Sequence, residues 1–492
     1  MCPTTLRLPA VVMVVAVLVA LAGHADSSPP VEPAKVVLGP ASHLETPDDP
    51  YIAVPAAERV TAPAQRWSVN GHVSVQVNIA ANGDNIVGDA ANEPSIAVNP
   101  TDPSRIAIGW RQFDTVASNF RQAGRGFSTD GGETWTFPGV LDPGVFRSDP
   151  VLDFNAAGTF YYDSLTDAFS CWVFTSTDSG ASWGSAISAY GDDKQWLTVD
   201  RSGGPGDGHL YQNWSPYITD ETFNRSIDGG VSFEMPIAVP EQPYWGVGTV
   251  APDGAVFVAG QASYSTGIAV VRSSNAQNAA ATPSFDQVTV VDLGGQLSGW
   301  DGPNPSGLLG QAWIAADHSD GPTHRYLYLL ASVDPTGPDP LDVHFSRSTD
   351  LGATWSVPVR VNDDPAGTNA WQWFGTMSVA PNGRIDVIWN DTRNDPGGLD
   401  SELTYAYSLD AGLTWSGNEV LSLPFDPHLG WPQQSKIGDY YDMISDSTGI
   451  HIAYAATFNG EQDVYYLHLD PPELFFDGFE SGGTTTWSAT FP

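Results

Sequence analysis

A short motif, Ser-x-Asp-x-Gly-x-(Thr/Ser)-(Trp/Phe), recurs five times along the 492-residue chain. Its copies are "STDGGETW", "STDSGASW", "SIDGGVSF", "STDLGATW" and "SLDAGLTW", with the aspartates at Asp130, Asp178, Asp228, Asp350 and Asp410. An aspartate caps a turn by accepting backbone N–H groups, and glycine supplies the positive φ at which a chain reverses. We interpret the motif as a structural turn, called the staple turn below, because every repeat needs the same joint whereas a reaction centre is needed once.

Seven two-stranded hairpins accompany the staple turns. They occupy residues 93–110, 149–164, 195–214, 245–260, 312–330, 374–389 and 440–456. Between Asp228 and Asp350 one staple copy is eroded, with Asn275 in the place of the aspartate. A fixed-period repeat with about four strands per unit predicts an all-β chain folded as a β-propeller. Seven blades are expected, with six as the alternative.

The flanking segments predict an exported protein. Residues 1–25 resemble a signal peptide, because one positive charge precedes the apolar run from Leu8 to Ala22 and small residues follow it. Residues 26–66 form a lead-in rich in proline and alanine, 67–470 the propeller, and 471–492 a C-terminal tail. We expect a strand within 68–79 to pair with 463–469 and close the ring, which removes an exposed sheet edge. The expected location is the periplasm or the exterior.

Composition excludes several classes of partner. The formal net charge of −38 repels nucleic acid and anionic membranes, and no membrane insertion is expected after signal cleavage. Cysteine pairs for zinc, phosphate-binding loops and Gly-x-Ser-x-Gly elbows do not occur in the sequence. No cofactor or metal is expected; Ca²⁺ in Asp-rich turns such as "DHSDGPTH" is a weak alternative, because regular ligand spacing is missing. The oligomeric state is left open.

Hairpin geometry points to a candidate site. In each hairpin the start of the first strand lies beside the end of the second, on the face opposite the staple turns. The first strands begin near Glu93, Asp149, Lys194, Trp245, Gln311, Phe374 and Tyr440, and the second strands end near Arg111, Asp114, Asp163, Trp214, Asp391 and Arg393. Carboxylates, arginines and aromatic rings in one bowl are typical of a sugar-binding surface. A rim of solvated polar residues is the competing interpretation.

The staple motif resembles the Asp-box (BNR) repeats of the sialidase superfamily over roughly residues 90 to 470. The resemblance implies a six-bladed wheel with an arginine triad, an aspartate acid/base and a Tyr–Glu nucleophile pair. On this resemblance "WRQFD" contributes Arg111 and Asp114, and "GDYYDM" contributes Tyr440 or, as second choice, Tyr441. "NEPS" departs from the family pattern by placing Glu93 where an arginine is expected, and a third arginine is not matched.

These observations give two functional hypotheses. The first is an exported sialidase-like glycoside hydrolase acting on glycans, including acidic sugars. Its catalytic residues would be Asp114, Tyr440 and Glu93, with Glu93 or Asp439 taking the Tyr440 proton. Its substrate would be held by Arg111, Arg393, Asp149, Trp245 and Asp391. The alternative is a non-catalytic propeller that binds glycan or protein partners.

Overall fold

The computed structural model describes residues 1, 49–55 and 58–472. Its contacts group residues 39–492 into one compact unit and residues 1–38 into another, and everything below concerns the larger unit. The expected signal peptide, most of the lead-in and the tail from residue 473 fall outside the described residues. Within those ranges the secondary structure is strand and turn without an α-helix, so no described helix has the length and apolarity to cross a membrane.

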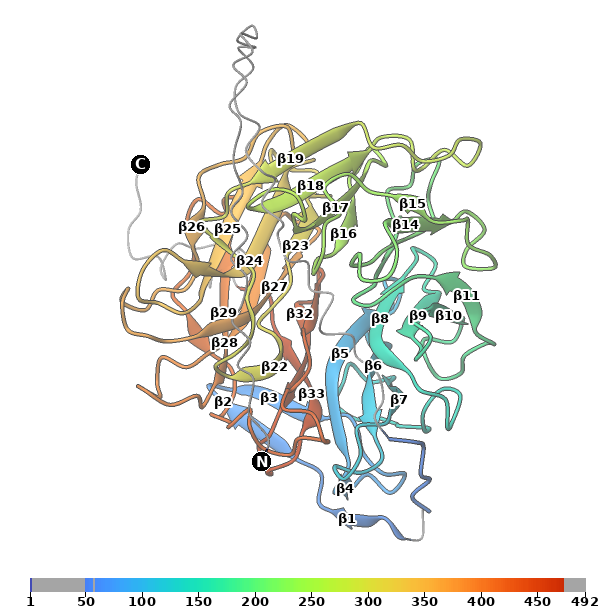
Figure 1. The fold of residues 1–492 in the computed structure, drawn as a ribbon, viewed down its shortest axis with the longest axis vertical. Helices are drawn as coiled ribbons and strands as arrows, with labels where there is room; N and C mark the ends of the chain where they lie inside the picture. The colour runs from blue at the N-terminus through green and yellow to red at the C-terminus, as the bar shows by residue number, and fades with distance from the viewer. Residues whose placement is uncertain (2–48, 56–57, 473–492) are drawn as a thin grey trace, which may run out of the picture. The chain divides into compact units, whose positions relative to one another are not determined.

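Seven antiparallel sheets form the blades of a β-propeller, and their first strands β5, β8, β16, β23 and β27 surround the centre of the view in Figure 1. Blades 1 to 4 are β5 (Ala90–Val98), β6 (Ile106–Phe113) and β7 (Arg121–Ser128); β8 (Ser148–Phe154), β9 (Phe160–Leu165), β10 (Cys171–Ser176) and β11 (Ile187–Tyr190); β12 (Trp196–Val199), β13 (Leu210–Asn213), β14 (Glu221–Ser226) and β15 (Ile237–Ala238); and β16 (Gly248–Val250), β17 (Val256–Gln261), β18 (Ile268–Ser273) and β19 (Gln287–Val291).

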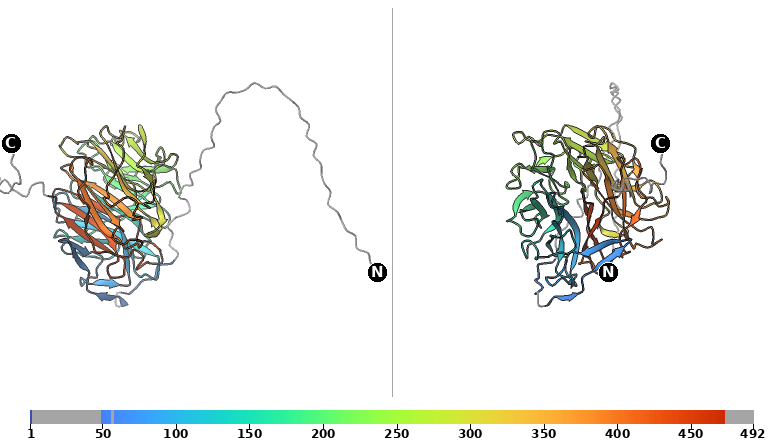
Figure 2. Two further views of the ribbon diagram at one scale, coloured as in Figure 1. Left: turned by 90° about the vertical axis from the view of Figure 1, so that its left-hand side faces the viewer. Right: turned by 180° about the vertical axis from the view of Figure 1, so that it is seen from behind.

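Blades 5 to 7 complete the propeller. They are β23 (Trp313–Ala316), β24 (Leu327–Pro335), β25 (Asp342–Ser348) and β26 (Val359–Arg360); β27 (Gln372–Val379), β28 (Ile385–Asp391), β29 (Glu402–Ser408) and β30 (Glu419–Val420); and β31 (Asp442–Ser445), β32 (Ile450–Ala456), β33 (Asp463–Leu469), β3 (His72–Gln76) and β2 (Arg66–Val69). Blades 6 and 7, orange to red, lie side by side in Figure 2 and share one hydrophobic cluster. The expected seven blades are confirmed over the alternative of six.

Five short strands lie outside this pattern. β1 (Val60–Ala62) pairs with β4 (Asn85–Val87), β20 (Gly295–Gln296) adds to β24, and β21 (Gly299–Asp301) forms a hairpin with β22 (Asn304–Leu308).

Burial explains the composition of the blades. The inner strands β5 and β6 are buried along their whole length, because each blade is covered by a neighbour on both faces, whereas outer strands such as β30 are partly exposed.

Blade 7 is built from both ends of the described chain. β3 pairs antiparallel with β33, with Ser74 opposite Leu467 and Gln76 opposite Tyr465. Blades 7 and 1 then share a hydrophobic cluster, and the Ser95 hydroxyl of blade 1 donates to Asp442 of blade 7 at 2.7 Å. Residues 68–79 and 463–469 therefore supply neighbouring strands of one sheet.

The staple turns have the hydrogen bonds that their residue types dictate. At Asp130 the Ser128 hydroxyl donates to Oδ1 at 2.7 Å, and the backbone N–H and hydroxyl of Thr134 donate to the two carboxylate oxygens at 3.0 and 2.5 Å. The other four copies repeat these contacts. The glycine that all five copies share lies against the preceding blade. In the first copy, a Cβ added at Gly132 would fall 2.0 Å from the Tyr466 ring.

The tryptophans of the staple turns differ in how far they are buried. Trp135 is buried against Tyr466 of blade 7, with ring centroids 5.3 Å apart. Trp183, Trp355 and Trp415 pack on hydrophobic clusters but remain partly exposed.

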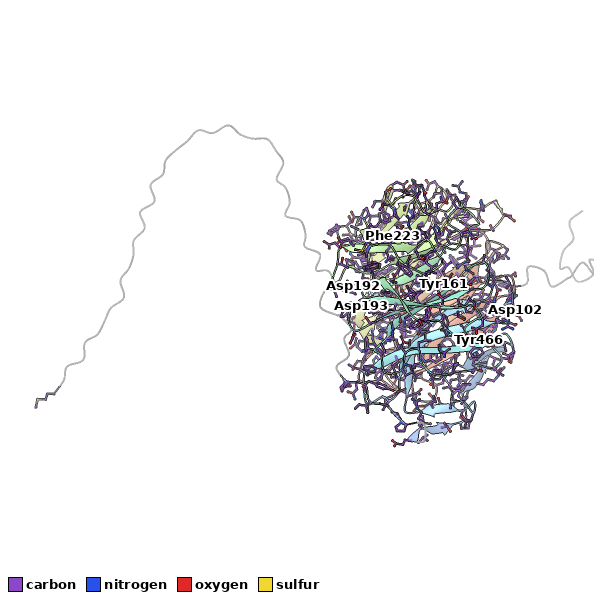
Figure 3. The ribbon with its side chains drawn as sticks, turned by 90° about the vertical axis from the view of Figure 1, so that its right-hand side faces the viewer. Asp102, Tyr161, Asp192, Asp193, Phe223 and Tyr466 are labelled. Carbon is purple, nitrogen blue, oxygen red and sulfur yellow. The ribbon has the colours of Figure 1, made fainter. Side chains whose placement is uncertain are left out.

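The blades have two distinct ends. Val98, Ile106 and Ser128 are in register with one another, so the hairpin turns and the staple turns share one end, called the turn end. Asn92, Arg111 and Ala123 are in register toward the other end, called the ring end. Figure 3 shows Asp102, in a hairpin turn of blade 1, on the opposite side of the molecule from Asp192 and Asp193.

Candidate functional site

Every blade has one residue of positive φ where its first strand begins. These residues are Glu93 (50°), Asp149 (47°), Lys194 (58°), Trp245 (55°), Gly310 (142°), Phe374 (60°) and Gly438 (100°). A positive φ costs a non-glycine residue about 1–2 kcal/mol, and the surrounding structure must hold it in place. In three blades the register of the first two strands shifts at this point, as in a β-bulge. Recurrence in all seven blades indicates an architectural feature of the propeller.

Eight charged side chains meet at the ring end and form the charged ring. Its members are Glu93, Arg111, Arg121, Asp149, Asp193, Lys194, Lys436 and Asp439, and each side chain is buried. Lys194 Nζ lies 3.4 Å from Asp149 and 3.6 Å from Asp193, and it also contacts Asp439. Because these groups come from blades 1, 2, 3 and 7, their mutual contacts place them around the axis.

The charged ring balances its charges internally, with four carboxyl groups and four cations. Arg111 Nε lies 3.1 Å from Glu93, and Lys436 Nζ lies 2.8 Å from Asp439. Burial alone would raise the pKa of Asp439, but Lys194 and Lys436 outweigh burial and hold that pKa well below its usual value. Burial raises the pKa of Glu93 well above its usual value, with Asp149 and Asp439 adding to the effect against Arg111.

Neighbouring segments cover the charged ring. Leu308 N–H, on the hairpin β21–β22, donates to Asp439 Oδ1 at 2.7 Å, and the Asn304 amide donates to Gly438 O at 2.8 Å. Trp300 of the same hairpin packs on Trp245, with centroids 5.2 Å apart. The Trp245 indole in turn donates to the Tyr217 hydroxyl at 2.7 Å. Among the described residues, the hairpin β21–β22 therefore covers part of the bowl that the sequence places at this end.

Tyr440 lies beside the charged ring, but its hydroxyl is engaged by the backbone. The hydroxyl donates to Pro150 O at 2.7 Å, and the side chain is buried. Burial raises the pKa of Tyr440 well above its usual value, and the charges of Glu93 and Asp149 raise it further. The carboxylates that were expected to accept the phenolic proton are occupied by Arg111, Lys194 and Lys436.

Asp114 lies apart from Tyr440, in a side pocket of about 600 Å³ between blade 1 and the segment that precedes it. Its carboxylate pairs with Arg59 at 2.8 Å and accepts a hydrogen bond from the Gln122 amide at 3.3 Å. Blade 1 and the chain segments before and after it line the side pocket, and Tyr440 is not among its lining residues.

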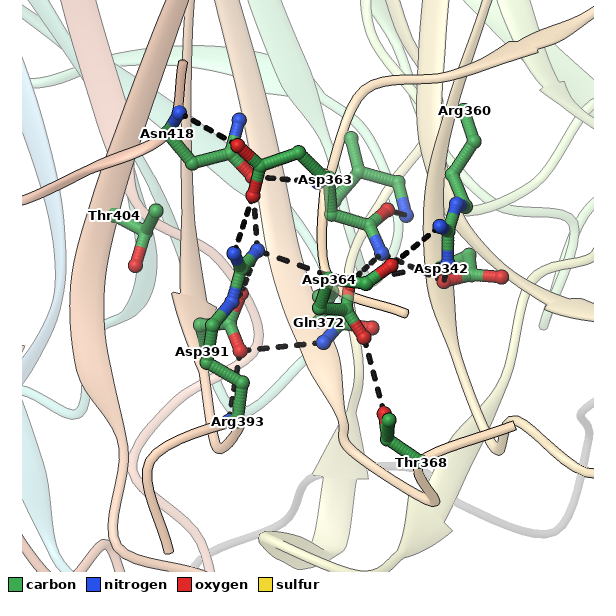
Figure 4. Close-up of polar contacts among 12 residues, drawn as sticks. Asp342, Arg360, Asp363, Asp364, Thr368, Gln372, Asp391, Arg393, Thr404 and Asn418 are labelled. Atoms are coloured by element: carbon green, nitrogen blue, oxygen red, sulfur yellow. Dashed lines mark hydrogen bonds and ion pairs between the residues drawn. The ribbon is translucent and has the colours of Figure 1, made fainter. Parts of the chain in front are cut away.

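Arg393 and Asp391 form a third location, between blades 5 and 6 (Figure 4). Arg393 Nε donates to Asp391 Oδ2 at 2.9 Å, and its Nη2 donates to Asn418 at 2.8 Å. Nη1 donates to Asp363 at 2.5 Å. Each nitrogen of the guanidinium therefore donates to a group of the protein itself. Of the residues that the sequence assigned to one site, the structure brings together Glu93, Arg111, Asp149 and Tyr440, with Trp245 beside them, and separates Asp114, Asp391 and Arg393.

An open cavity occupies the turn end of the same axis. This axial pocket measures about 430 Å³. All seven blades contribute to its lining, with Val98, Phe154, Trp196, Thr198, Arg201, Gly248, Trp313, His318, Ser378, Asp442 and Asp446 among the lining residues. A volume of this size lies within the roughly 300–1,000 Å³ of small-molecule sites.

Two tryptophans separate the axial pocket from the charged ring. Trp196 packs edge to face on Trp313 at 5.1 Å, and it also packs edge to face on Tyr440 at 5.5 Å. Trp196 and Trp313 line the axial pocket. On the other side, the charges of Glu93 and Asp149 in the charged ring raise the pKa of Tyr440. Along the axis, the charged ring is therefore followed by a layer of aromatic side chains and then by the open axial pocket.

Metal binding has no support in the residues 49–55 and 58–472. Among them no group of three or more His, Cys, Asp or Glu side chains is arranged to hold a metal ion. The Ca²⁺ alternative raised by the Asp-rich turns is left without a ligand set in this part of the chain.

Comparison with known proteins leaves the family open. No known protein-family profile matches the sequence, and no curated protein matches it. Solved structures with a similar fold include a protein of unknown function from Dyadobacter fermentans, at 13% identity over 83% of this chain and 99% of that chain (TM-score 0.46). A Hadza microbial sialidase matches at 14% identity over 77% of this chain and 65% of its own (TM-score 0.41). A structure of YCF48 bound to D1 peptide matches at 13% identity over 83% of this chain and 99% of that chain (TM-score 0.42). At this similarity none of them transfers a function.

Sequence reasoning missed two groups of residues. Arg121, Asp193 and Lys436 belong to the charged ring but were not among the expected site residues. The scarcity of lysine was a signal that could have identified Lys436, because Lys194 and Lys436 are two of only three lysines in the chain. The axial tryptophans were also missed. "WLTVD" and "WIAAD" place Trp196 and Trp313 at the same position of two first strands, and that match could have identified them.

Proposed function

We propose that this chain is an exported, ligand-binding β-propeller that takes its ligand in the axial pocket. One observation carries the proposal: the axial pocket is an open cavity lined by all seven blades, whereas the hydroxyl of the expected nucleophile, Tyr440, belongs to a buried side chain and donates to Pro150 O. Aromatic rings with a few polar groups in a concave site are typical of small-molecule recognition. The export part rests on the apolar run from Leu8 to Ala22.

The competing proposal is a sialidase-like glycoside hydrolase. It is favoured by one observation, the gathering of Glu93, Arg111 and Tyr440 from blades 1 and 7. It needs a nucleophile that can lose its proton and an acid that reaches the same glycosidic oxygen. The Tyr440 hydroxyl is instead held by Pro150 O, and Asp114 pairs with Arg59 elsewhere.

Two assays on purified protein separate the proposals. Glycan and peptide arrays test binding, and fluorogenic neutral and acidic glycosides test turnover, each with wild type, Tyr440→Phe and Asp114→Asn. We expect saturable binding that both variants retain, with no turnover. Turnover by wild type that is lost in Tyr440→Phe and Asp114→Asn would establish the hydrolase instead.

A further inference from the structure

The side pocket lies where blade 1 lacks a fourth strand. Blade 1 has three strands among the described residues, and the chain after its edge strand β7 is bridged to that strand at Thr136 and again at Leu141. Pro138 stands between these two bridges and has no N–H to donate, so strand pairing is interrupted there. Residues 137–140 line the side pocket instead of extending the sheet.

A second part of the lining belongs to residues 49–55 and 58–62, called the arm. Asn119 N–H, in the loop between β6 and β7, donates to Asp49 Oδ2 at 3.2 Å. At the other end of the arm, β1 pairs with β4. The arm is thus held at both ends, and it contributes to the lining Tyr51, Val54, Arg59 and Thr61.

The accessible surface of the side pocket is mainly apolar. Tyr51 is 37% exposed, and Val54, Phe137 and Val140 are partly exposed. Phe137 is held in place by Trp110, which packs on it edge to face with ring centroids 5.0 Å apart. These side chains keep apolar area in contact with water, so a ligand that covers them with its own apolar surface is favoured.

One ion pair lies within this apolar lining. Arg59 Nη2 lies 2.8 Å from Asp114 Oδ1, and the two side chains are 25% and 12% exposed. The other Asp114 oxygen accepts the Gln122 amide at 3.3 Å. Nε and Nη1 of Arg59 donate to no group within residues 49–55 and 58–472. The side pocket therefore offers unused guanidinium donors, whereas both oxygens of its carboxylate are occupied.

The charges favour a neutral ligand group over a charged one. An anionic group would bind beside Asp114, in a chain of formal net charge −38, while the positive charge of Arg59 is already compensated. A cationic group would have to displace Arg59 from Asp114. Burying a charge without its own counter-charge is unfavourable, whereas a carbonyl oxygen accepts a hydrogen bond from Arg59 without adding charge.

We propose that the side pocket is a second ligand site, which binds a neutral molecule with a ring-based apolar body and one carbonyl acceptor. The body would lie against Tyr51, Phe137 and Val140, and the carbonyl oxygen would accept a hydrogen bond from Arg59. The volume of about 600 Å³ lies within the roughly 300–1,000 Å³ of small-molecule sites. The side pocket shares no lining residue with the axial pocket, so the two sites are independent.

The test titrates the folded protein with three molecules that share a naphthyl body, namely naphthaleneacetamide, naphthaleneacetate and naphthylethylamine. Their head groups are neutral, anionic and cationic at neutral pH. Isothermal titration calorimetry measures the affinity of each. We expect the amide to bind, and the acetate and the amine to bind at least about 10-fold more weakly, because each brings an uncompensated charge into the side pocket.

Four tryptophan variants locate the bound amide. Val140→Trp should abolish binding, because the indole fills space that the ligand needs. Ala81→Trp should do the same from an exposed turn that also lines the side pocket. Val145→Trp is the matched control, because Val145 lies in the same segment as Val140, is 41% exposed and does not line the pocket. Pro381→Trp adds the same bulk to the axial pocket and should leave amide binding unchanged. Thermal unfolding shows that each variant is folded.

The proposal is wrong if none of the three molecules binds, or if all three bind equally well. Equal losses in Val140→Trp and Val145→Trp would also overturn it. Binding that Pro381→Trp removes, while Val140→Trp and Ala81→Trp retain it, would place the naphthyl molecule in the axial pocket instead. If the arrays identify no ligand while the amide still binds in the expected pattern, the proposed function fails and the side pocket remains a ligand site.

Discussion

The two ends of the propeller axis differ in how they are closed. At the ring end, eight charged side chains are buried, cations pair with carboxylates, and the hairpin β21–β22 donates a hydrogen bond to Asp439. At the turn end, all seven blades line a cavity of about 430 Å³.

This difference separates stability from recognition. Breaking a buried ion pair leaves an uncompensated charge, so residues of the charged ring should mainly affect folding. The axial pocket is an open cavity, so residues of its lining should mainly affect binding. Each prediction below tests one side of this division.

The largest expected effect is the loss of Lys194. Lys194→Met removes the cation shared by Asp149, Asp193 and Asp439, and should lower the free energy of unfolding by about 3–5 kcal/mol. Arg66→Met is the matched control, because the Arg66–Glu133 pair is exposed and should contribute less than about 1 kcal/mol. Urea denaturation measures both. Equal losses would show that the charged ring is not a stabilising element.

Trp135→Ala should give the next largest effect and lower the free energy of unfolding by about 3 kcal/mol. Trp135 is buried between blades 1 and 7, and truncation leaves a cavity beside Tyr466. Trp183→Ala should cost less, because its indole is already partly exposed. The thermal unfolding midpoints rank the two variants, and the reverse order would contradict the packing described for the seam between blades 7 and 1.

A further effect depends on pH and is measured as a slope of stability rather than as a loss at one pH. Burial raises the pKa of Asp163, on β9, to about 8. The unfolded value is about 3.9, so between pH 4 and 8 the folded state binds the extra proton and stability falls as pH rises, by at most about 1.4 kcal/mol per pH unit. Unfolding should occur at a higher temperature at pH 5 than at pH 8. Asp163→Asn should reduce that difference, whereas exposed Asp167→Asn should preserve it.

The staple aspartates should give the smallest effect, with the opposite sign. Burial alone would raise the pKa of Asp410, but hydrogen bonds from Thr414 and Ser408 outweigh burial and lower it. Its contribution is therefore present above about pH 4 and lost as pH falls through the folded pKa. Asp410→Asn should cost about 0.5 kcal/mol at pH 7, since the site is mostly exposed, and nothing in strong acid. Exposed Asp334→Asn should be neutral at both pH values.

The sequence predicted the blades because the relevant interactions are local. Each staple turn is complete within eight consecutive residues, so Asp130 and its copies identify the repeat directly. The charged ring could not be read in the same way. Lys194 meets Asp439, 245 residues later, and their contact depends on how seven blades surround an axis. In the structure Tyr440 lies near Glu93 and Arg111, but its hydrogen bond to Pro150 O has no signature in "GDYYDM".

The most direct test is a crystal structure of the propeller with the tightest-binding ligand that the arrays identify. We predict that this ligand occupies the axial pocket, which Trp196 and Trp313 line. The charged ring should be unchanged, with Lys194 still paired to its carboxylates. A ligand bound to Arg111 and Tyr440, with the hairpin β21–β22 displaced from the ring, would contradict the account.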